Sequence, residues 1–317
     1  MAIHFINPGG SYSHLLNRII WPIAAALPQE VGASIGPSHD LTRFNVHFFR
    51  EDLDTFGNPR QCCDLHLSHG FMQKLFEPTP ERLKKFAFLG VPGPTVRDCL
   101  VEHGIPAGQI VIAGHPGMDD EFRRQKAFAD GHLKEFYGQH VIRDARLAAK
   151  NPKPIVVWAP SHSAFLGEYV KPPVVFTRAL EEEFTIIKTE HPARSISPVL
   201  TRELFHYAKA VVGDISGTIF EAWAMGLPVI FPDWLIGEYV ETYCGGMPLG
   251  RIYSEGIGRH VMTPEDFPDA VREAVAEGIT EREQQFVDEY FPPDLRGTSG
   301  LAVAQFLQGV RRVWIAG

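Results

Sequence analysis

Short apolar runs recur along the chain and alternate with polar loops and helical stretches. Short runs of mainly apolar residues, two to six residues long and set between polar loops, predict buried β-strands. Where a loop and a helix separate two such runs, the pattern is typical of a parallel βαβ unit. We expect strands at 3–6, 44–49, 86–91, 109–113, 155–158, 186–187, 210–212 and 229–231, and another that ends just before His69. The pattern therefore predicts an α/β protein built on parallel sheets.

The helical stretches and the proline-rich break between them suggest two domains. Helices are expected at about 15–27, 96–104, 219–225, 269–276 and 299–313. A polar helical region follows Asp119, and Asn151-Pro152-Lys153-Pro154 then interrupts the chain. At 317 residues the chain is long enough for two α/β domains or one large one. We place the linker in this region, which gives domains at 1–150 and 151–300.

The loop after the run 210–212 carries the most suggestive chemistry. It contains Asp214, Ser216, Gly217 and Thr218 and leads directly into a helix. Backbone N–H groups and hydroxyls at a helix start favour an anion, most often a phosphate. Thr218 with Glu221 three residues later also fits a capping box, which needs no ligand.

Two cationic or polar side chains strengthen the phosphate interpretation. His191 and Arg194 leave the preceding predicted strand on the same side of the sheet, and Arg is suited to bidentate phosphate contact.

This half of the chain resembles the donor half of the CDP-glycerol glycerophosphotransferase family, the teichoic-acid primases and polymerases. The matching blocks are His-Pro-x-Arg, Asp-Ile-Ser-Gly and Phe-Glu-x-Trp-x-x-Gly-x-Pro-Val-Ile-Phe, in that order. The family pattern has Asp-Tyr-Ser-Ser, so Gly217 replaces a serine. The resemblance implies the GT-B architecture, two Rossmann-like domains with parallel sheets facing a central cleft. It also implies that the terminal helix at 301–317 packs back on the first domain.

The amino-terminal half matches the family at a second motif. The family carries Trp-His-Gly-x-x-x-Lys where this chain has Ser68, His69, Gly70 and Lys74. A histidine at a strand end has a pKa suited to taking a proton from an attacking hydroxyl. The resemblance implies that His69 is this general base, and Ser68 in place of Trp changes how the acceptor packs. Isolated histidines are more often structural.

Three further loops complete the predicted site. Gly10 and Ser11 lie in a loop after the first strand where such enzymes approach a substrate, although a plain strand–helix connection explains this loop more simply. The segment Gly114 to Asp119 resembles Gly-Tyr-Pro-Arg-x-Asp with Gly117 in place of Arg, and we interpret His115 as structural. Ser161 resembles a family loop residue and either contacts the donor phosphate or supports the loop.

The roles follow from the resemblance. His191 stabilises the donor phosphate or leaving group beside Arg194, and Ser216, Gly217 and Thr218 hold the pyrophosphate. Asp214 either orients a histidine or bonds the loop, and Glu221 either caps its helix or binds the ribose. No Asp-x-Asp pair occurs near these motifs, so we expect neither a metal nor another cofactor.

Composition limits the partners. A net charge of −8 argues against a broadly basic nucleic-acid or membrane surface, so nucleic acid is expected only as an acceptor. The chain has no run of eighteen apolar residues, so no membrane span is predicted. The first residues lack the basic start of a signal peptide. The four cysteines have no metal-ligand spacing and indicate reduced thiols. We expect a cytoplasmic protein.

The sequence therefore predicts a transferase that moves a glycerophosphate or sugar unit from a nucleotide-activated donor to a hydroxyl acceptor. Three alternatives stay open at this point. The first is a nucleotide-sugar glycosyltransferase that acts on a modified nucleic-acid base or a small molecule. The second is a nucleotide-sugar epimerase of the same fold, and the third is a non-catalytic nucleotide-binding protein.

Overall fold

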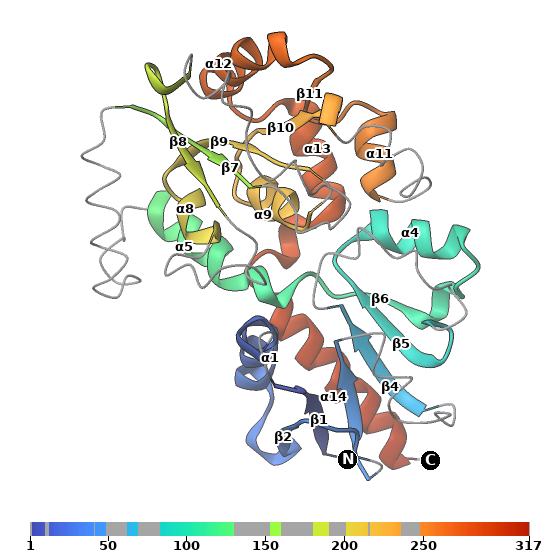
Figure 1. Cartoon of the computed structure of the whole chain (residues 1–317). Helices are drawn as coiled ribbons and strands as arrows, with labels where there is room; N and C mark the ends of the chain where they lie inside the picture. Colours follow the sequence, from blue (N-terminus) through green and yellow to red (C-terminus); the bar gives the residue numbers. More distant parts are fainter. Residues whose placement is uncertain are drawn as a thin grey trace. The chain divides into compact units, whose positions relative to one another are not determined.

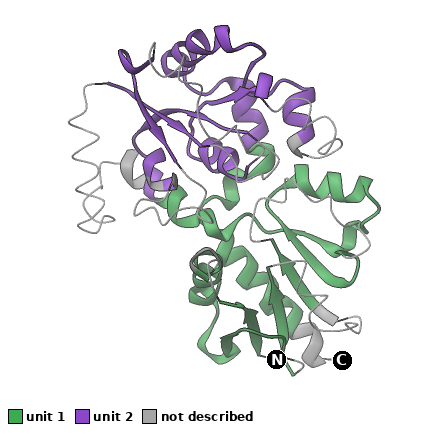
Figure 2. Ribbon diagram, in the orientation of Figure 1, with its two compact units in different colours: residues 1–123, 288–317 green, residues 124–287 purple. Residues whose placement is uncertain are grey.

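A computed structural model describes residues 2–9, 13–40, 42–48, 62–68, 83–129, 153–159, 180–189, 201–214, 216–235 and 248–316. The chain divides into two compact units (Figure 2). Unit 1 comprises residues 1–123 and 288–317, and unit 2 comprises residues 124–287. Each unit contains one parallel β-sheet (Figure 1).

Unit 1 is built on a six-stranded parallel sheet, which we call sheet A, in the order β2-β1-β3-β4-β5-β6. The strands coincide with the apolar runs, since a parallel sheet buries both faces. The strands are β1 (Ile3–Ile6), β2 (Ala33–Gly36), β3 (Phe44–His47), β4 (Cys62–Leu67), β5 (Phe86–Val91) and β6 (Ile110–Ile112). The helices of unit 1 include α1 (Ser13–Ala26), α4 (Pro94–Glu102), α5 (Asp119–Ala129) and α14 (Ser299–Ala316).

The main core of unit 1 lies between one face of sheet A and the pair α1 and α14. Alternate strand residues such as Phe5, Val46 and Leu65 meet Ile20 of α1 and Leu307 of α14 in this core. The helix that ends the chain thus packs against the helix that follows the first strand (Figure 1).

Unit 2 is built on a five-stranded parallel sheet, sheet B, in the order β11-β10-β9-β7-β8. Trp158, Val212 and Phe267 belong to its core, on the side of the helix 267–277, while Trp223 in the helix 218–224 packs near Phe286 in the helix 281–290. The strands are β7 (Ile155–Trp158), β8 (Thr185–Lys188), β9 (Ala208–Val212), β10 (Val229–Pro232) and β11 (Arg259–Val261). The helices are α8 (Thr201–Phe205), α9 (Thr218–Ala224), α11 (Pro248–Ser254), α12 (Phe267–Glu277) and α13 (Glu281–Tyr290).

The predicted fold class, an α/β protein with two parallel sheets, is confirmed. The unit boundaries at residues 123 and 287 fall inside the helices α5 and α13. The sequence pattern missed β2 and β11, because each is short and its residues are only partly buried.

Candidate functional site

The loop between β9 and α9 lies at the carboxyl edge of sheet B, where the parallel strands end. Gly213 leaves the strand so close to α9 that a Cβ on it would lie 2.5 Å from Ile219 Cγ2. The close approach explains glycine at this position. The next residue, Asp214, is fully buried, and its Oδ1 accepts a hydrogen bond from the backbone N–H of Ser216 at 3.0 Å. Of the two roles predicted for Asp214, this contact fits the one that bonds the loop.

The hydroxyl of Ser216 is a buried polar atom at this edge. Within the described part of the chain, Ser216 Oγ has no hydrogen-bond partner. A buried hydroxyl without a partner costs about 1–3 kcal/mol, so such an atom marks a place where a ligand or water can bond. The loop therefore offers one donor and acceptor beside the buried Asp214 carboxylate.

The capping box predicted at Thr218 and Glu221 is wrong. Gly217 is the N-cap residue of α9, and as a glycine it has no side chain to cap the helix. The carboxylate of Glu221 pairs instead with the guanidinium of Arg202, a buried residue of α8. Glu221 is thus tied to a neighbouring helix, and the ribose role stays a prediction.

A genuine capping box lies elsewhere in unit 2. The hydroxyl of Thr280 accepts the N–H of Glu283 at 3.2 Å, and Glu283 Oε2 accepts the N–H of Thr280 at 2.8 Å. Its other oxygen, Oε1, accepts the indole N–H of Trp223 at 3.0 Å and the N–H of Val229 at 3.2 Å. The buried Glu283 therefore fixes α9 and β10, which carry the loops of the candidate edge.

Two residues of the same edge escaped the sequence interpretation. Asp233 follows β10, and its Oδ2 lies 2.8 Å from Nδ1 of His260 on β11. The His260 ring stacks on the ring of Phe231. The second oxygen of Asp233, Oδ1, is buried and has no hydrogen-bond partner among the described residues. The signal in the sequence was an acid two residues after the apolar run 229–231, where the carboxyl end of a parallel strand meets the ligand edge.

Most of the other predicted site residues lie outside the described residues. They stay predictions, and only their place in the chain order can be given. Ser161 and His191 each follow by three residues a strand of sheet B that the structure describes, β7 and β8. The residues concerned are Gly10, Ser11, His69, Gly70, Lys74, Ser161, His191 and Arg194.

In unit 1 the segment after β6 is buried and makes hydrogen bonds with the first residues of α14. Asp119 is 1% exposed, and its carboxylate accepts the N–H groups of Ser299 and Gly300 at 3.0 and 2.7 Å. Burial raises the pKa of Asp119 above the usual 3.8, although these hydrogen bonds act in the opposite direction. His115, interpreted as structural, is buried in the same loop, and its backbone N–H donates to Ser299 Oγ at 3.1 Å.

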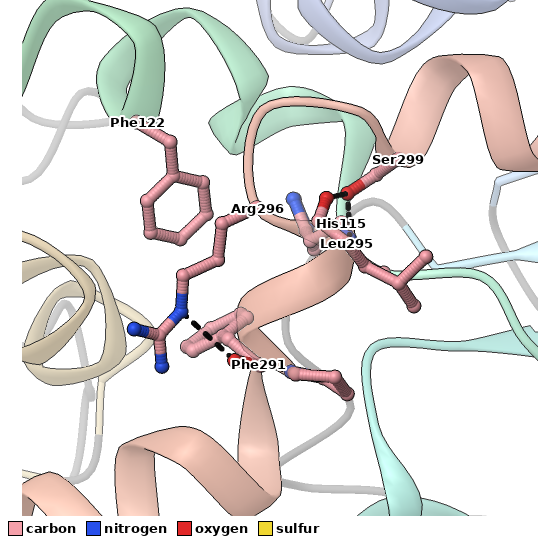
Figure 3. A pocket seen from close by; sticks show the side chains of 8 residues that line it. His115, Phe122, Phe291, Leu295, Arg296 and Ser299 are labelled. Carbon is pink, nitrogen blue, oxygen red and sulfur yellow. Dashed lines mark hydrogen bonds between the residues drawn. The ribbon is translucent and has the colours of Figure 1, made fainter. Parts of the chain in front are cut away.

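A shallow pocket lies beside this loop (Figure 3). It encloses about 150 Å³, including space open to solvent, whereas ligand pockets usually measure roughly 300–1,000 Å³. The Arg296 guanidinium lies 5.9 Å from the centre of the Phe122 ring, and its Nε donates to the Phe291 carbonyl at 2.9 Å. The pocket is too small for a nucleotide, and its cation already has protein partners.

One group of described side chains has the composition and spacing of a metal site. It comprises His39, His47 and Asp64, which belong to unit 1, whereas the sheet B edge belongs to unit 2.

Among the described helices, none is long and apolar enough to cross a membrane.

Models of protein families and curated protein sequences give no match to the chain. Several solved structures, in contrast, are similar to the chain. A variant of the wall teichoic acid polymerase TagF soaked with CDPG has a TM-score of 0.67 at 14% identity, over 100% of this chain and 90% of that chain. MnaA of S. aureus, in a co-structure with UDP, has a TM-score of 0.57 at 11% identity over 99% and 97%. The UDP-GlcNAc 2-epimerase of Methanocaldococcus jannaschii has a TM-score of 0.57 at 13% identity over 97% and 99%.

These similarities extend over almost the whole chain and agree with the two parallel sheets. They show that the chain has the GT-B fold that the sequence resemblance implied. Because all three identities are below 15%, the comparison establishes the fold and not the reaction.

Proposed function

We propose that the protein is a transferase that binds a nucleotide-activated donor at the carboxyl edge of sheet B. It moves a glycerophosphate or sugar unit from this donor to a hydroxyl acceptor. The observation that carries the donor site is the buried Ser216 hydroxyl, which lacks a partner among the described residues. The backbone N–H of the same residue donates to the buried Asp214 carboxylate, which holds the loop. The likeness to a polymerase solved after a soak with CDPG supports the reaction class by analogy.

In this proposal the donor phosphates lie against the β9–α9 loop. Ser216 Oγ donates to a phosphate oxygen, and the backbone around Gly217 and Thr218 faces the same group. His191 and Arg194 supply positive charge to the leaving phosphate, so no metal or other cofactor takes part in the step. Ser161 contributes a further hydroxyl from the loop after β7.

On the acceptor side, His69 removes the proton from the attacking hydroxyl. For a glycerophosphate donor, the acceptor oxygen then bonds to the distal phosphorus, and the bond to the nucleoside monophosphate breaks. For a sugar donor, the oxygen attacks the anomeric carbon, and a nucleoside diphosphate leaves. Gly10, Ser11, Gly70 and Lys74 are proposed to position the acceptor.

An epimerase is the second candidate, because two of the similar solved structures are UDP-GlcNAc 2-epimerases. The two reactions differ in their need for an acceptor. An epimerase converts its nucleotide sugar when incubated alone, whereas a transferase consumes donor only when a hydroxyl acceptor is present. Product analysis of donor-only reactions therefore separates them.

The donor site is tested first by thermal unfolding in the presence of CDP-glycerol, CDP, UDP, GDP, ADP and their sugar adducts. A ligand at a hundred times its Kd stabilises the fold by about 2.7 kcal/mol. A shift with cytidine nucleotides alone supports glycerophosphate transfer, and a shift with uridine nucleotides moves the proposal to sugars. If no nucleotide shifts the melting temperature, the donor-site assignment is refuted.

Variants then locate the site. Ser216→Ala is expected to weaken nucleotide binding about tenfold, since one hydrogen bond to a charged group contributes roughly 1.5 kcal/mol or more. Ser254→Ala is the matched control, because Ser254 is an exposed serine of the same unit. Equal nucleotide affinity in the two variants would contradict the role of Ser216.

The general base is tested separately. His69→Ala is expected to lower the transfer rate at least about a hundredfold and to leave nucleotide affinity unchanged. A non-catalytic nucleotide-binding protein would show no transfer in the wild type and no effect of His69→Ala.

A further inference from the structure

Sheet A has an apolar face under α1 and α14, and along β3 and β4 its other face is buried but polar. Along β3 and β4 every second side chain belongs to the core under α1 and α14. The residues between them are at most 5% exposed and point to the other face. They are Asn45, His47, Asp64 and His66. Buried polar side chains need partners, so this face must be organised by hydrogen bonds or by an ion.

The connection from β2 to β3 is held against this polar face. Residues 37–40 and 42–43, the described part of this connection, contain no helix. His4 Nε2 lies 2.9 Å from the Ser38 carbonyl, and the N–H of Asp40 donates to Asn45 Oδ1 at 2.9 Å. Asn45 Nδ2 also donates to the Asp40 carbonyl at 3.0 Å. The connection thereby brings His39 over β4.

Three side chains converge below this connection. His39 Nε2 lies 2.7 Å from Asp64 Oδ2, and His47 Nε2 lies 3.2 Å from the same oxygen. One ligand atom from each residue lies within 4.8 Å of the others. The side chains are 10%, 7% and 3% exposed for His39, Asp64 and His47.

The carboxylate is oriented so that one oxygen faces the two imidazoles. Asp64 Oδ1 accepts the backbone N–H of Asn45 at 3.0 Å, which leaves Oδ2 for the histidines. Burial by itself raises the pKa of Asp64, but the hydrogen bonds from His47, His39 and Asn45 outweigh it and the pKa is lowered. A carboxylate held by a backbone N–H is the kind of support that metal ligands receive in proteins.

We propose that His39, His47 and Asp64 form a binding site for a transition-metal ion, with Zn²⁺ as the ion that fits best. Two imidazole nitrogens and a carboxylate oxygen are ordinary zinc ligands, bonded at about 2.0–2.2 Å. Ligand atoms of a tetrahedral zinc site therefore lie about 3.4 Å apart. The two contacts to Asp64 Oδ2, at 2.7 and 3.2 Å, need to lengthen by less than about 1 Å, and the two imidazole nitrogens, which lie within 4.8 Å of each other, need to approach by at most about 1.4 Å. The fourth position goes to water on the side of His39, the least buried ligand.

The convergence of two histidines on one oxygen distinguishes this cluster from the half-buried pair of Asp233 and His260, in which the described residues place one histidine on the carboxylate. The ion joins the β2–β3 connection to β3 and β4, so its expected role is to stabilise unit 1. The site is independent of the proposed donor site, whose residues belong to unit 2.

The test uses the full-length protein, stripped with a chelator and then titrated with Zn²⁺ against a chromophoric competitor. We expect one tightly bound Zn²⁺ per chain in the wild type. Asp64→Asn, His39→Gln and His47→Gln should each weaken binding at least about a hundredfold, since loss of a supporting residue alone costs about 10–100-fold. Substitution with Co²⁺ should give the visible absorption of a nitrogen- and oxygen-ligated ion in the wild type, and His39→Gln should remove it.

The controls make each outcome decisive. His260→Gln removes a histidine from the other His–Asp pair and should bind Zn²⁺ within about threefold of the wild type. If a buried variant fails to fold by circular dichroism, His39→Gln decides, because its side chain is the most exposed of the three ligands. Zinc that stays in all three ligand variants but is lost in Cys62→Ser with Cys63→Ser would overturn the site, as would a wild type that binds no zinc.

Discussion

At the scale of single residues, Glu283 is the buried charge of unit 2 with the most described partners. Its two oxygens accept hydrogen bonds from groups on α9, on β10 and at the start of its own helix, and the side chain is fully buried. Such a carboxylate is stable in the interior only while every donor stays paired.

Glu283→Gln is therefore expected to lower the free energy of unfolding by about 1–3 kcal/mol. The amide group has a single acceptor oxygen, so its nitrogen must face either Trp223 and Val229 or Thr280, all of which are donors. Glu281→Gln, an exposed change two residues away, should stay within about 0.5 kcal/mol of the wild type. Urea unfolding measures both, and equal stability of the two variants would contradict the role of Glu283.

Asp119 gives a prediction about pH. Its pKa is raised above 3.8 in the folded state, so folding favours the protonated form. The stabilisation from this proton is fully present below pH 3.8 and is lost as the pH rises through the raised pKa. The stability difference between wild type and Asp119→Asn should accordingly shrink as the pH rises across this window.

Asp119→Asn should also be less stable than the wild type by about 1–3 kcal/mol, because its NH₂ group would face a backbone N–H of α14. Asp120→Asn on the same helix changes an exposed carboxylate and serves as the control. Urea unfolding at several pH values from 3.5 to 7 measures the effect. A stability difference that stays constant across this range would refute the assignment.

Residue-scale contacts also show why part of the site could not be predicted. The pattern Thr-x-x-Glu occurs at Thr218 and Glu221 and again at Thr280 and Glu283. Only the second pair forms a capping box. Glu221 instead pairs with Arg202, nineteen residues earlier in the chain. A local pattern contains no information about such a partner, so the two helix starts look alike in the sequence.

At the scale of elements, α14 and α1 cross closely at Gly300. A Cβ on this glycine would lie 2.6 Å from Pro22 Cβ and 2.7 Å from its carbonyl carbon. Helices approach this closely only where one of them lacks a side chain. Gly309 lies on the same helix, and a Cβ there would have nothing within 4 Å among the described residues.

The two glycines of α14 should respond to alanine in opposite directions. Gly300→Ala is expected to destabilise the protein by about 1–3 kcal/mol, because α1 and α14 must separate. Gly309→Ala should stabilise it by up to about 1 kcal/mol through the higher helix propensity of alanine. Thermal unfolding of both variants is the measurement, and destabilisation by both would contradict the crossing geometry.

Elements differ in how well their sequence predicts them. The strands 3–6, 86–91 and 155–158 were predicted with the bounds observed, because continuous burial leaves an apolar run. A strand was also predicted at 44–49, where β3 is observed at Phe44–His47. The sequence pattern did not predict that Asn45 and His47 are buried, since the connection that covers them is polar and irregular.

At the scale of the whole molecule, unit 2 is continuous in the sequence and unit 1 is not. The core of unit 1 takes Val303, Ala304 and Leu307 from α14, and burying a Val or Leu side chain contributes about 1.5–3 kcal/mol. Residues 1–123 alone lack this layer, whereas residues 124–290 contain the complete sheet B and all of α13.

We therefore expect residues 124–290 to unfold cooperatively as an isolated fragment and residues 1–123 not to do so. Co-expression of 1–123 with 288–317 should restore a cooperative transition. Circular dichroism during heating measures each case. Cooperative unfolding of 1–123 by itself would show that α14 is dispensable for this unit.

The discontinuity of unit 1 also sets an order of events during synthesis on the ribosome. Residues 1–123 emerge first, but their core is closed only when residues 299–316 have left the exit tunnel. Unit 2 is complete before that point. Among these 317 residues, the segment translated first thus belongs to the unit completed last, and the part of the apolar face of sheet A that α14 covers stays exposed while unit 2 is translated.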